Sequence, residues 1–320
     1  MGPEFPPATG VRTAWAEMPG SVRSAVERVL GEVVVEARSQ PGGFSPGVAA
    51  RLRLADGRRA FVKAVSEAAN PESPALHRRE ATIARALPDS APAPRFLGTI
   101  DRDGWVALVY EDIEGRQPIL PWRPDELRLV LDAVTQLAEA LTPTPIEVEP
   151  LALAHADTFD GLRRLRDLRR SGDPLAGIDP WLLRNLARLA EWEARWGALA
   201  AGETLLHVDP RADNLIFTPD GRVVVVDWPH AAVGAAWVDL LCMLPSVAMQ
   251  GGPEPWEVFD DHPVARRADP EAVTAMLCGL TGLFVANGRE PDPPGLPTLR
   301  RQLAQGEAAT RWLRRRTGWE

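Results

Sequence analysis

The stretch Leu205-Leu206-His207-Val208-Asp209-Pro210-Arg211-Ala212-Asp213-Asn214 decides the interpretation of this sequence. After it, the pattern predicts a short strand pair, residues 214–217 and 222–226, joined by a Pro-Asp-Gly turn. Three oxygen donors, Asp209, Asn214 and Asp227, flank this hairpin as a catalytic base and two ligands of a hard cation would. Magnesium prefers a few such oxygens together with water and substrate phosphates. An ordinary acidic turn is the alternative.

Lys63 is the only lysine in the chain, so the other 35 of the 36 basic residues are arginine. It lies in the middle of a predicted strand, residues 59–65, on the same face as Phe61 and Val65. An ammonium group is a compact charge with rotatable donors, which suits contact with phosphate oxygens. We therefore interpret Lys63 as a phosphate-contacting residue. A surface lysine on an edge strand is the alternative.

Glu80 falls within the apolar stripe of a predicted helix, residues 72–87. A carboxylate buried there without a partner would cost roughly several kcal/mol. We expect Lys63, on the neighbouring strand, to be that partner. In the alternative, Glu80 lies at the margin of the stripe and contacts water, Arg79 or Arg85.

The segment 41–47, Pro-Gly-Gly-Phe-Ser-Pro-Gly, joins two predicted strands. Gly42 and Gly43 would allow the backbone to approach an anion, as a loop that covers a phosphate requires. A hairpin loop without a ligand is the more common meaning of this composition.

The whole pattern predicts an α+β, bilobal chain. Residues 1–112 would form a small antiparallel-sheet N-terminal lobe with one helix, and residues 113–320 a larger, mostly helical C-terminal lobe. The expected strands of the first lobe are 33–37, 48–54, 59–65, 96–100 and 105–110. The expected helices of the second are 125–141, 159–170, 180–199, 270–286 and 297–316. The apolar stretch 231–249, interrupted by Asp239 and Pro245, is interpreted as a buried helix rather than a membrane span.

Composition narrows the class of protein. A chain of 320 residues with 45% hydrophobic residues can bury a sizeable core, which excludes a disordered chain. A net charge of −8 argues against a nucleic-acid partner, because phosphate neutralisation needs a basic surface. Cys242 and Cys278 lack metal-ligand spacing, which favours free thiols. The first 30 residues lack the apolar run of a secretory signal, so we expect a cytoplasmic protein without a membrane partner.

The His-x-Asp motif, followed five residues after the Asp by Asn214 and then by Asp227 after a hydrophobic strand, resembles the aminoglycoside phosphotransferase and choline kinase branch of the protein-kinase-like fold. The resemblance spans residues 33–244, with Lys63, Glu80 and the glycine loop in the right order. The second metal motif is Asp-Trp-Pro rather than Asp-Phe-Gly, and no Ala-Pro-Glu segment is present. These features favour a small-molecule acceptor over a protein substrate.

The resemblance implies a role for each matching residue. Asp209 would be the catalytic base, Arg211 would lie near the transferred phosphoryl group, and His207 would brace the loop. Asn214 and Asp227 would hold Mg²⁺. The residues implied to bind ATP or GTP are Lys63, Glu80, Gly42, Gly43 and Ser45, with Tyr110, Glu111 and Ile113 as the hinge whose backbone contacts the purine.

Two further positions depart from the family pattern, and a third agrees with it. Val208 and Pro210 flank the base where many relatives have glycine and leucine, and the proline removes one backbone donor from the loop. Asp239 resembles the family's supporting aspartate behind the catalytic loop. A helix aspartate near the positive end of the helix dipole is the alternative for Asp239.

The expected activity is transfer of the γ-phosphoryl group of ATP or GTP to a hydroxyl of a polar acceptor. Residues 201–262 hold ten acidic residues and two arginines, and an acidic rim formed by Glu254, Glu257, Asp260 and Asp261 would favour a cationic acceptor. Such acceptors include an aminoglycoside or another antibiotic, an amino sugar and a choline-like metabolite. A solvated acidic loop is the alternative for this segment. A non-catalytic regulator that binds a nucleotide or metabolite is the alternative function, and the pattern leaves the oligomeric state open.

Overall fold

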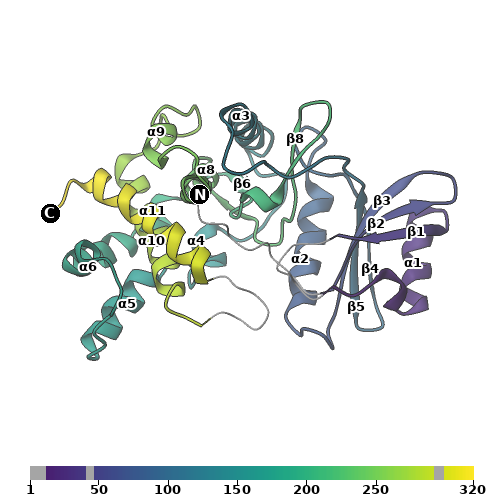
Figure 1. Ribbon diagram of the computed structural model, residues 1–320, viewed down its shortest axis with the longest axis horizontal. Helices are drawn as coiled ribbons and strands as arrows, with labels where there is room; N and C mark the ends of the chain where they lie inside the picture. The colour runs from purple at the N-terminus through teal and green to yellow at the C-terminus, as the bar shows by residue number, and fades with distance from the viewer. Residues whose placement is uncertain (1–11, 41–46, 292–298) are drawn as a thin grey trace.

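A five-stranded antiparallel sheet and a mostly helical region form the two halves of the computed structural model, which describes residues 12–40, 47–291 and 299–320 (Figure 1). This is the α+β, two-lobed architecture that the sequence predicts. The strand order of the sheet is β1-β2-β3-β5-β4. Its strands are β1 (Val34–Ser39), β2 (Val48–Leu54), β3 (Arg59–Ser66), β4 (Phe96–Arg102) and β5 (Trp105–Glu111).

Two helices cover opposite faces of this sheet (Figure 1). Val22 of α1 (Gly20–Leu30) packs in one cluster with Val62 and Val109. On the other face, Ala84 of α2 (Ser73–Ala86) packs with Leu108. Because side chains alternate along a strand, Lys63 lies on the face that α2 covers. Helix α1 and the short helix η1 (Trp15–Glu17) were not among the predicted elements, and the five strands and α2 lie within two residues of their predicted bounds.

The C-terminal region is built around α10 (Pro270–Asn287), whose residues are buried along most of its length. Its length and composition would allow a membrane span, but 67% of its apolar window is buried inside the protein, as in a core helix. The other helices of this region are α3 (Pro124–Ala140), α4 (Leu151–Ala154), α5 (Gly161–Arg170), α6 (Pro180–Glu193), α7 (Trp196–Leu199), α8 (Val238–Met249), α9 (Pro255–Phe259) and α11 (Leu299–Thr317).

Two predicted helices are interrupted in the structure. The stretch 231–249 is buried as expected, but Ala232–Gly234 form strand β9, which pairs with β6 (Thr204–Leu206), and only α8 is helical. A Cβ on Gly234 would lie 2.8 Å from the Leu206 side chain, so glycine allows this close strand pairing. The predicted helix 180–199 is divided into α6 and α7.

The predicted hairpin after Asn214 is present as β7 (Leu215–Phe217) and β8 (Val223–Val225). The short helix η2 (Ala212–Asn214) leads into it, and η1 (Trp15–Glu17) precedes α1. The backbone of Arg116, in the linker between the lobes, pairs with Phe217. This pairing holds the linker against the hairpin that carries the candidate site.

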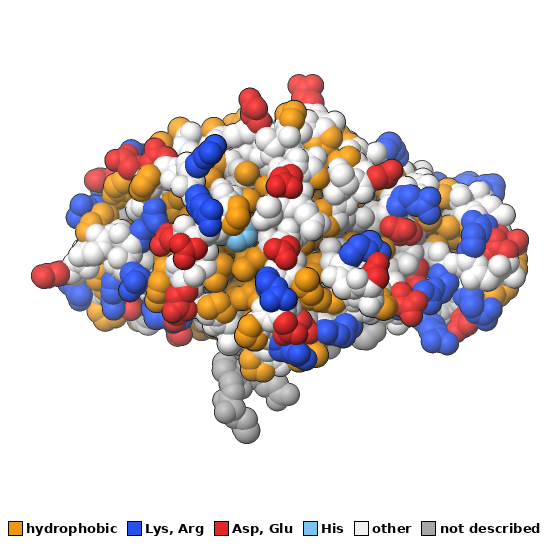
Figure 2. All heavy atoms as spheres, turned by 90° about the horizontal axis from the view of Figure 1, so that it is seen from above, with side chains coloured by type: hydrophobic (Ala, Val, Ile, Leu, Met, Phe, Trp, Pro, Cys, Tyr) orange, Lys and Arg blue, Asp and Glu red, His pale blue; other side chains and the backbone are white. Residues whose placement is uncertain are grey.

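Both cysteines are buried free thiols, as expected. On the face of the molecule seen in Figure 2, acidic and basic side chains are interspersed.

Candidate active site

A cavity of about 170 Å³ brings together α2 from the first lobe and the loops around the β7–β8 hairpin from the second. Several of the predicted site residues face this cavity, together with residues that the sequence analysis did not select. Its lining residues are Ser73, Leu76, His77, Glu80, Asp209, Arg211, Asp213, Asn214, Asp227, Pro229 and His230.

Lys63 pairs with one carboxylate from each lobe. Its Nζ contacts Glu80 Oε2 and donates to Asp227 Oδ1 at 2.6 Å. The predicted pair with Glu80 is therefore confirmed, and Glu80 is buried at 2% exposure rather than placed at the margin of its helix. Burial alone would lower the pKa of Lys63, but the two carboxylates outweigh it and raise the pKa, so Lys63 stays charged.

The segment 207–214 holds Asp209 and Asn214 side by side. The Asn214 amide donates to the backbone oxygen of Asp209 at 2.9 Å, and its nitrogen lies 3.4 Å from Asp209 Oδ2. Because the amide nitrogen is used in this way, the Asn214 side-chain oxygen is left as the atom suited to a cation. Asp209 and Asn214 both line the cavity.

Asp209 is a weaker acid than an ordinary aspartate side chain. Burial raises its pKa to about 6, against an opposing effect of the Arg211 charge. Arg211 Nη2 lies 3.4 Å from Asp209 Oδ2 and 3.1 Å from Asp213 Oδ2, so the guanidinium is held between two carboxylates. At neutral pH Asp209 can accept a proton, while Arg211 supplies positive charge beside it.

His207 does not line the cavity and instead stabilises the loop that carries Asp209. Its Nε2 lies 2.9 Å from the Val226 carbonyl oxygen, and its Nδ1 accepts the Asp209 N–H at 3.2 Å. This pair of contacts requires a neutral ring with the proton on Nε2, and burial lowers the His207 pKa to about 4. The ring also packs edge-on against Trp228, with centroids 4.7 Å apart. His207 therefore ties the Asp209 loop to the strand that precedes Asp227.

Asp239 supports the same loop from behind. Its carboxylate accepts the backbone N–H of His207 at 2.8 Å and that of Val208 at 2.7 Å. Val208 has a φ of 71°, a conformation that costs a β-branched residue energy and that glycine adopts freely. This backbone conformation explains why glycine would suit the position, and the two hydrogen bonds to Asp239 stabilise it in valine. Asp239 also lies in the first turn of α8, so both sequence interpretations describe it.

Asp227 is more acidic than Asp209, which lines the same cavity. Burial would raise its pKa, but the charge and hydrogen bond of Lys63 outweigh that effect and lower the pKa to about 2. Asp227 also has a positive φ of 71°, so the chain holds it in a strained conformation at the end of β8.

The donor set fits a magnesium ion. Asp227 is ionised, and Asn214 offers an amide oxygen beside the same cavity. In the described part of the chain, no group of three His, Cys, Asp or Glu side chains is arranged to hold a metal alone. Magnesium commonly takes one or two protein oxygens and completes its shell with water and phosphate, which matches this set.

Two backbone groups of the predicted hinge, the Glu111 N–H and the Ile113 carbonyl, already have hydrogen-bond partners within the protein. The Asp112 carboxylate is buried between Arg51 Nε at 2.9 Å and Arg59 Nε at 3.3 Å, and Arg51 also donates to the Ile113 carbonyl. The Glu111 N–H donates to the Arg95 carbonyl oxygen at 3.0 Å. Purine contact by the hinge backbone stays a prediction, as does phosphate contact by Gly42, Gly43 and Ser45, which lie outside the described residues.

Sequence reasoning missed several residues of the site. His77 and His230 line the cavity, and burial lowers the pKa of His77 to about 3. His77 lies three residues before Glu80 on α2, and this helical spacing is a local signal that could have found it. Arg301, from α11, lies 3.6 Å from Asp213 Oδ1, and the charge of Asp227 acts on Arg12. These two arginines approach from opposite ends of the chain, so no local pattern could have found them.

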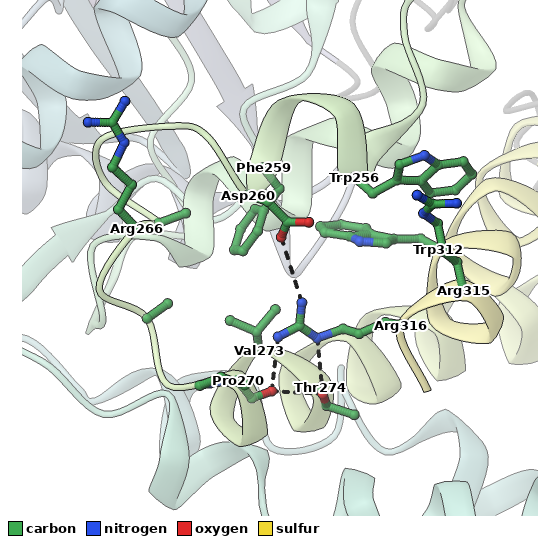
Figure 3. Close-up of a pocket in the computed structure, with 12 residues that line it drawn as sticks. Trp256, Phe259, Asp260, Arg266, Pro270, Val273, Thr274, Trp312, Arg315 and Arg316 are labelled. Atoms are coloured by element: carbon green, nitrogen blue, oxygen red, sulfur yellow. Dashed lines mark hydrogen bonds and ion pairs between the residues drawn. The ribbon is translucent and has the colours of Figure 1, made fainter. Parts of the chain in front are cut away.

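The acidic segment does not form the expected rim beside Asp209. Its residues do not line the catalytic cavity; Asp260 instead borders a separate cavity of about 520 Å³ between α9, α10 and α11 (Figure 3). There Arg316 points across to Asp260, with Nη1 3.9 Å from Oδ1. Glu254 pairs with Arg311 at 3.0 Å. Two of the four acidic residues of the segment, Glu254 and Asp260, therefore pair with arginines of α11, against which α9 packs.

A family model matches most of this chain. The model described as the phosphotransferase enzyme family matches residues 41–274, which is more than half of the chain. A comparison with curated proteins gave no match.

Solved structures share the fold at low sequence identity. The aminoglycoside phosphotransferase from Alicyclobacillus acidocaldarius is 19% identical, with a TM-score of 0.60 over 89% of this chain and 92% of that one. Choline kinase LicA from Streptococcus pneumoniae is 15% identical, with a TM-score of 0.58 over 92% and 97%. A thermostable mutant of aminoglycoside phosphotransferase APH(4)-Ia, in a ternary complex with ADP and hygromycin B, is 14% identical, with a TM-score of 0.58 over 94% and 100%.

Proposed function

Because this chain belongs to the phosphotransferase enzyme family, we propose that it transfers the γ-phosphoryl group of ATP or GTP to a hydroxyl group of a small polar molecule. One observation carries the proposal. Asp209, Asn214 and Asp227 lie around one cavity, and Lys63 reaches the same place from the other lobe. A base, two cation ligands and a phosphate-binding ammonium are the parts that phosphoryl transfer needs.

Asp209 receives the proton in this reaction. The acceptor hydroxyl hydrogen-bonds to the Asp209 carboxylate, its oxygen attacks the γ-phosphorus, and the bond from that phosphorus to the β,γ-bridging oxygen breaks. The hydroxyl proton passes to Asp209, and the nucleoside diphosphate leaves with the bridging oxygen. Asn214 keeps the Asp209 loop in place through its hydrogen bond to the Asp209 carbonyl.

Positive charge from this chain stabilises the transferred group. Arg211 lies beside Asp209, and Lys63 stays protonated between its two carboxylates. Asn214 and Asp227 would hold Mg²⁺, which neutralises phosphate charge when it is bound. Phosphoryl transfer depends mostly on such positioning and electrostatic stabilisation.

We base the proposed acceptor class on a chemical group that the ligands of several similar structures share, and not on the ligand of a single one. Similar structures hold hygromycin B or spectinomycin, and another is a choline kinase. Hygromycin B, spectinomycin and choline are all small polar molecules that carry a hydroxyl group. The acidic segment at Glu254 and Asp260 pairs with α11 and does not line this cavity, so it does not support a preference for a cationic acceptor.

A coupled assay of nucleotide consumption tests the proposal. It contains Mg²⁺, ATP or GTP, and a panel of aminoglycosides, other hydroxylated antibiotics, amino sugars and choline-like amines. We expect an acceptor-dependent rate that Asp209→Asn and Lys63→Ala abolish, while the exposed-turn variant Asp220→Asn retains it. Nucleotide binding without transfer to any acceptor would contradict the proposal and favour a non-catalytic regulator.

A further inference from the structure

We propose that Tyr110 is the positioning residue that fixes Lys63 for its contact with the nucleotide phosphates, and that it acts through Glu80. The proposal rests on the proposed function of Lys63 and gives the Tyr110 side chain a role beyond the hinge backbone. Tyr110 is the only tyrosine in a chain that has 8 phenylalanines and 11 tryptophans. The only phenol and the only ammonium group of a side chain therefore meet at the same carboxylate.

The sheet register brings these residues together. Lys63 of β3 is the register partner of Leu108 in β5, and Tyr110 follows Leu108 by two residues. Residues two apart share one face of a strand, so Tyr110 lies beside Lys63 under α2. The Tyr110 hydroxyl donates to Glu80 Oε1 at 2.8 Å, while Lys63 contacts Glu80 Oε2.

The Glu80 carboxylate uses one partner on each oxygen. Glu80 is 2% exposed, so water does not replace a missing partner easily. If the Tyr110 hydroxyl is removed, Oε1 loses its donor in an apolar environment. Glu80 must then rotate or take up a proton, and either change weakens its hold on Lys63.

A second anchor is needed because Asp227 has two tasks. Asp227 pairs with Lys63 at 2.6 Å, but it is also the proposed magnesium ligand. Glu80 is the partner of Lys63 that is not also a proposed metal ligand. Tyr110 can act as a fixed donor because its ring is 5% exposed and packs edge-on against Phe96 at 5.3 Å. Burial and the Glu80 charge raise its pKa, so the hydroxyl keeps its proton.

The first test uses the only lysine as its own reporter. The rate at which acetic anhydride labels Lys63 at pH 9 is measured by mass spectrometry in the wild type and in Tyr110→Phe, which keeps the ring. We expect labelling to rise by about threefold or more, because an ammonium group that Glu80 no longer holds firmly leaves its ion pairs more often and meets the reagent. Thr99→Val removes a hydroxyl of the same sheet that bonds only to the Ala107 carbonyl oxygen and not to Glu80, so it serves as the control and should label at the wild-type rate. An unchanged rate in Tyr110→Phe overturns the proposal.

The second test is a double-mutant cycle on turnover. Tyr110→Phe should lower kcat on the order of tenfold, the effect of about one hydrogen bond to a charged group, with a smaller change in the nucleotide KM. If Tyr110 acts through Glu80, adding Tyr110→Phe to Glu80→Gln should cause little further loss. Multiplying losses would contradict the proposal.

The labelling test needs no acceptor, which separates the two proposals. Faster labelling in Tyr110→Phe, combined with no transfer to any acceptor, would support the Tyr110 network and contradict the proposed reaction. Tyr110→Leu removes the same hydroxyl with a different side-chain shape, and circular dichroism checks its fold. Labelling at the wild-type rate in a folded Tyr110→Leu variant also overturns the proposal.

Discussion

At the scale of single residues, opposite pKa shifts divide the work between two carboxylates of one cavity. Asp209 has a pKa of about 6 because it is buried, and Asp227 has a pKa of about 2 because Lys63 outweighs its burial. The first can exchange a proton near neutral pH, while the second stays ionised as a cation ligand must. Their surroundings therefore suit Asp209 to act as a base and Asp227 to act as a ligand.

The activity should depend on pH through Asp209. A base must be deprotonated, so kcat/KM should fall as the pH drops through about 6 and approach a plateau above it. The Arg211 charge lowers the Asp209 pKa. Arg211→Gln should therefore move this acidic limb to higher pH, besides lowering the rate. A pH profile of both proteins measures this, and a limb that stays in place or moves to lower pH would argue against Asp209 as the titrating base.

Magnesium dependence should fall on Asp227. Asp227→Asn removes the ionised ligand, so the affinity for AMP-PNP in the presence of Mg²⁺ should fall by about tenfold or more. Asp220→Asn, in the exposed turn of the same hairpin, is the matched control and should bind like the wild type. Isothermal titration calorimetry measures both variants. Equal affinity in Asp227→Asn and the wild type would remove Asp227 from the metal site.

At the scale of elements, α8 supports the catalytic loop through Asp239. Asp239→Ala leaves the N–H groups of His207 and Val208 without acceptors, and we expect the free energy of unfolding to fall by about 3 kcal/mol. Turnover per folded molecule should fall as well, because Val208 no longer holds its positive φ. Denaturant unfolding and kcat measure the two effects.

The N-cap of α10 gives a control with the same chemistry. Asp269 accepts the N–H of Glu271 at 2.8 Å, far from the catalytic loop in the chain. Asp269→Ala should lower the free energy of unfolding by about 1 kcal/mol and leave turnover per folded molecule unchanged. If both variants lose turnover in proportion to stability, Asp239 has no specific link to the loop.

Elements and pairs that arise from local periodicity were predictable. The β2 strand follows from its strand-like composition, and the Lys63–Glu80 pair follows from helical spacing and from the need of a buried carboxylate for a partner. The β6–β9 pairing was not predictable, because Leu206 meets Ala232 through a contact between distant residues, and the apolar run 231–249 has the composition of a helix. Arg301 was missed for the same reason, since α11 reaches Asp213 only in the folded chain.

At the scale of the whole molecule, Lys63 of the first lobe links to the second lobe through Asp227, while Glu80 holds it from its own lobe. A nucleotide that binds between the lobes with Mg²⁺ stabilises the folded state, and the stabilisation grows with the logarithm of its concentration relative to its Kd. We expect Mg²⁺ with AMP-PNP to raise the melting temperature by several degrees, since a ligand at 100 times its Kd contributes about 2.7 kcal/mol. Differential scanning fluorimetry measures this shift. An equal shift in the presence of EDTA would contradict a role for the metal.

The central claim is transfer of a phosphoryl group to a small hydroxylated molecule, and it is tested most directly by following the phosphorus atom. The protein is incubated with Mg²⁺, nucleotide labelled with ³²P at the γ position, and each member of the acceptor panel, and the products are separated by chromatography. The account predicts label on one class of small acceptor, absent in Asp209→Asn. Label that appears only on polypeptide, or only as free phosphate whatever the acceptor, would contradict it.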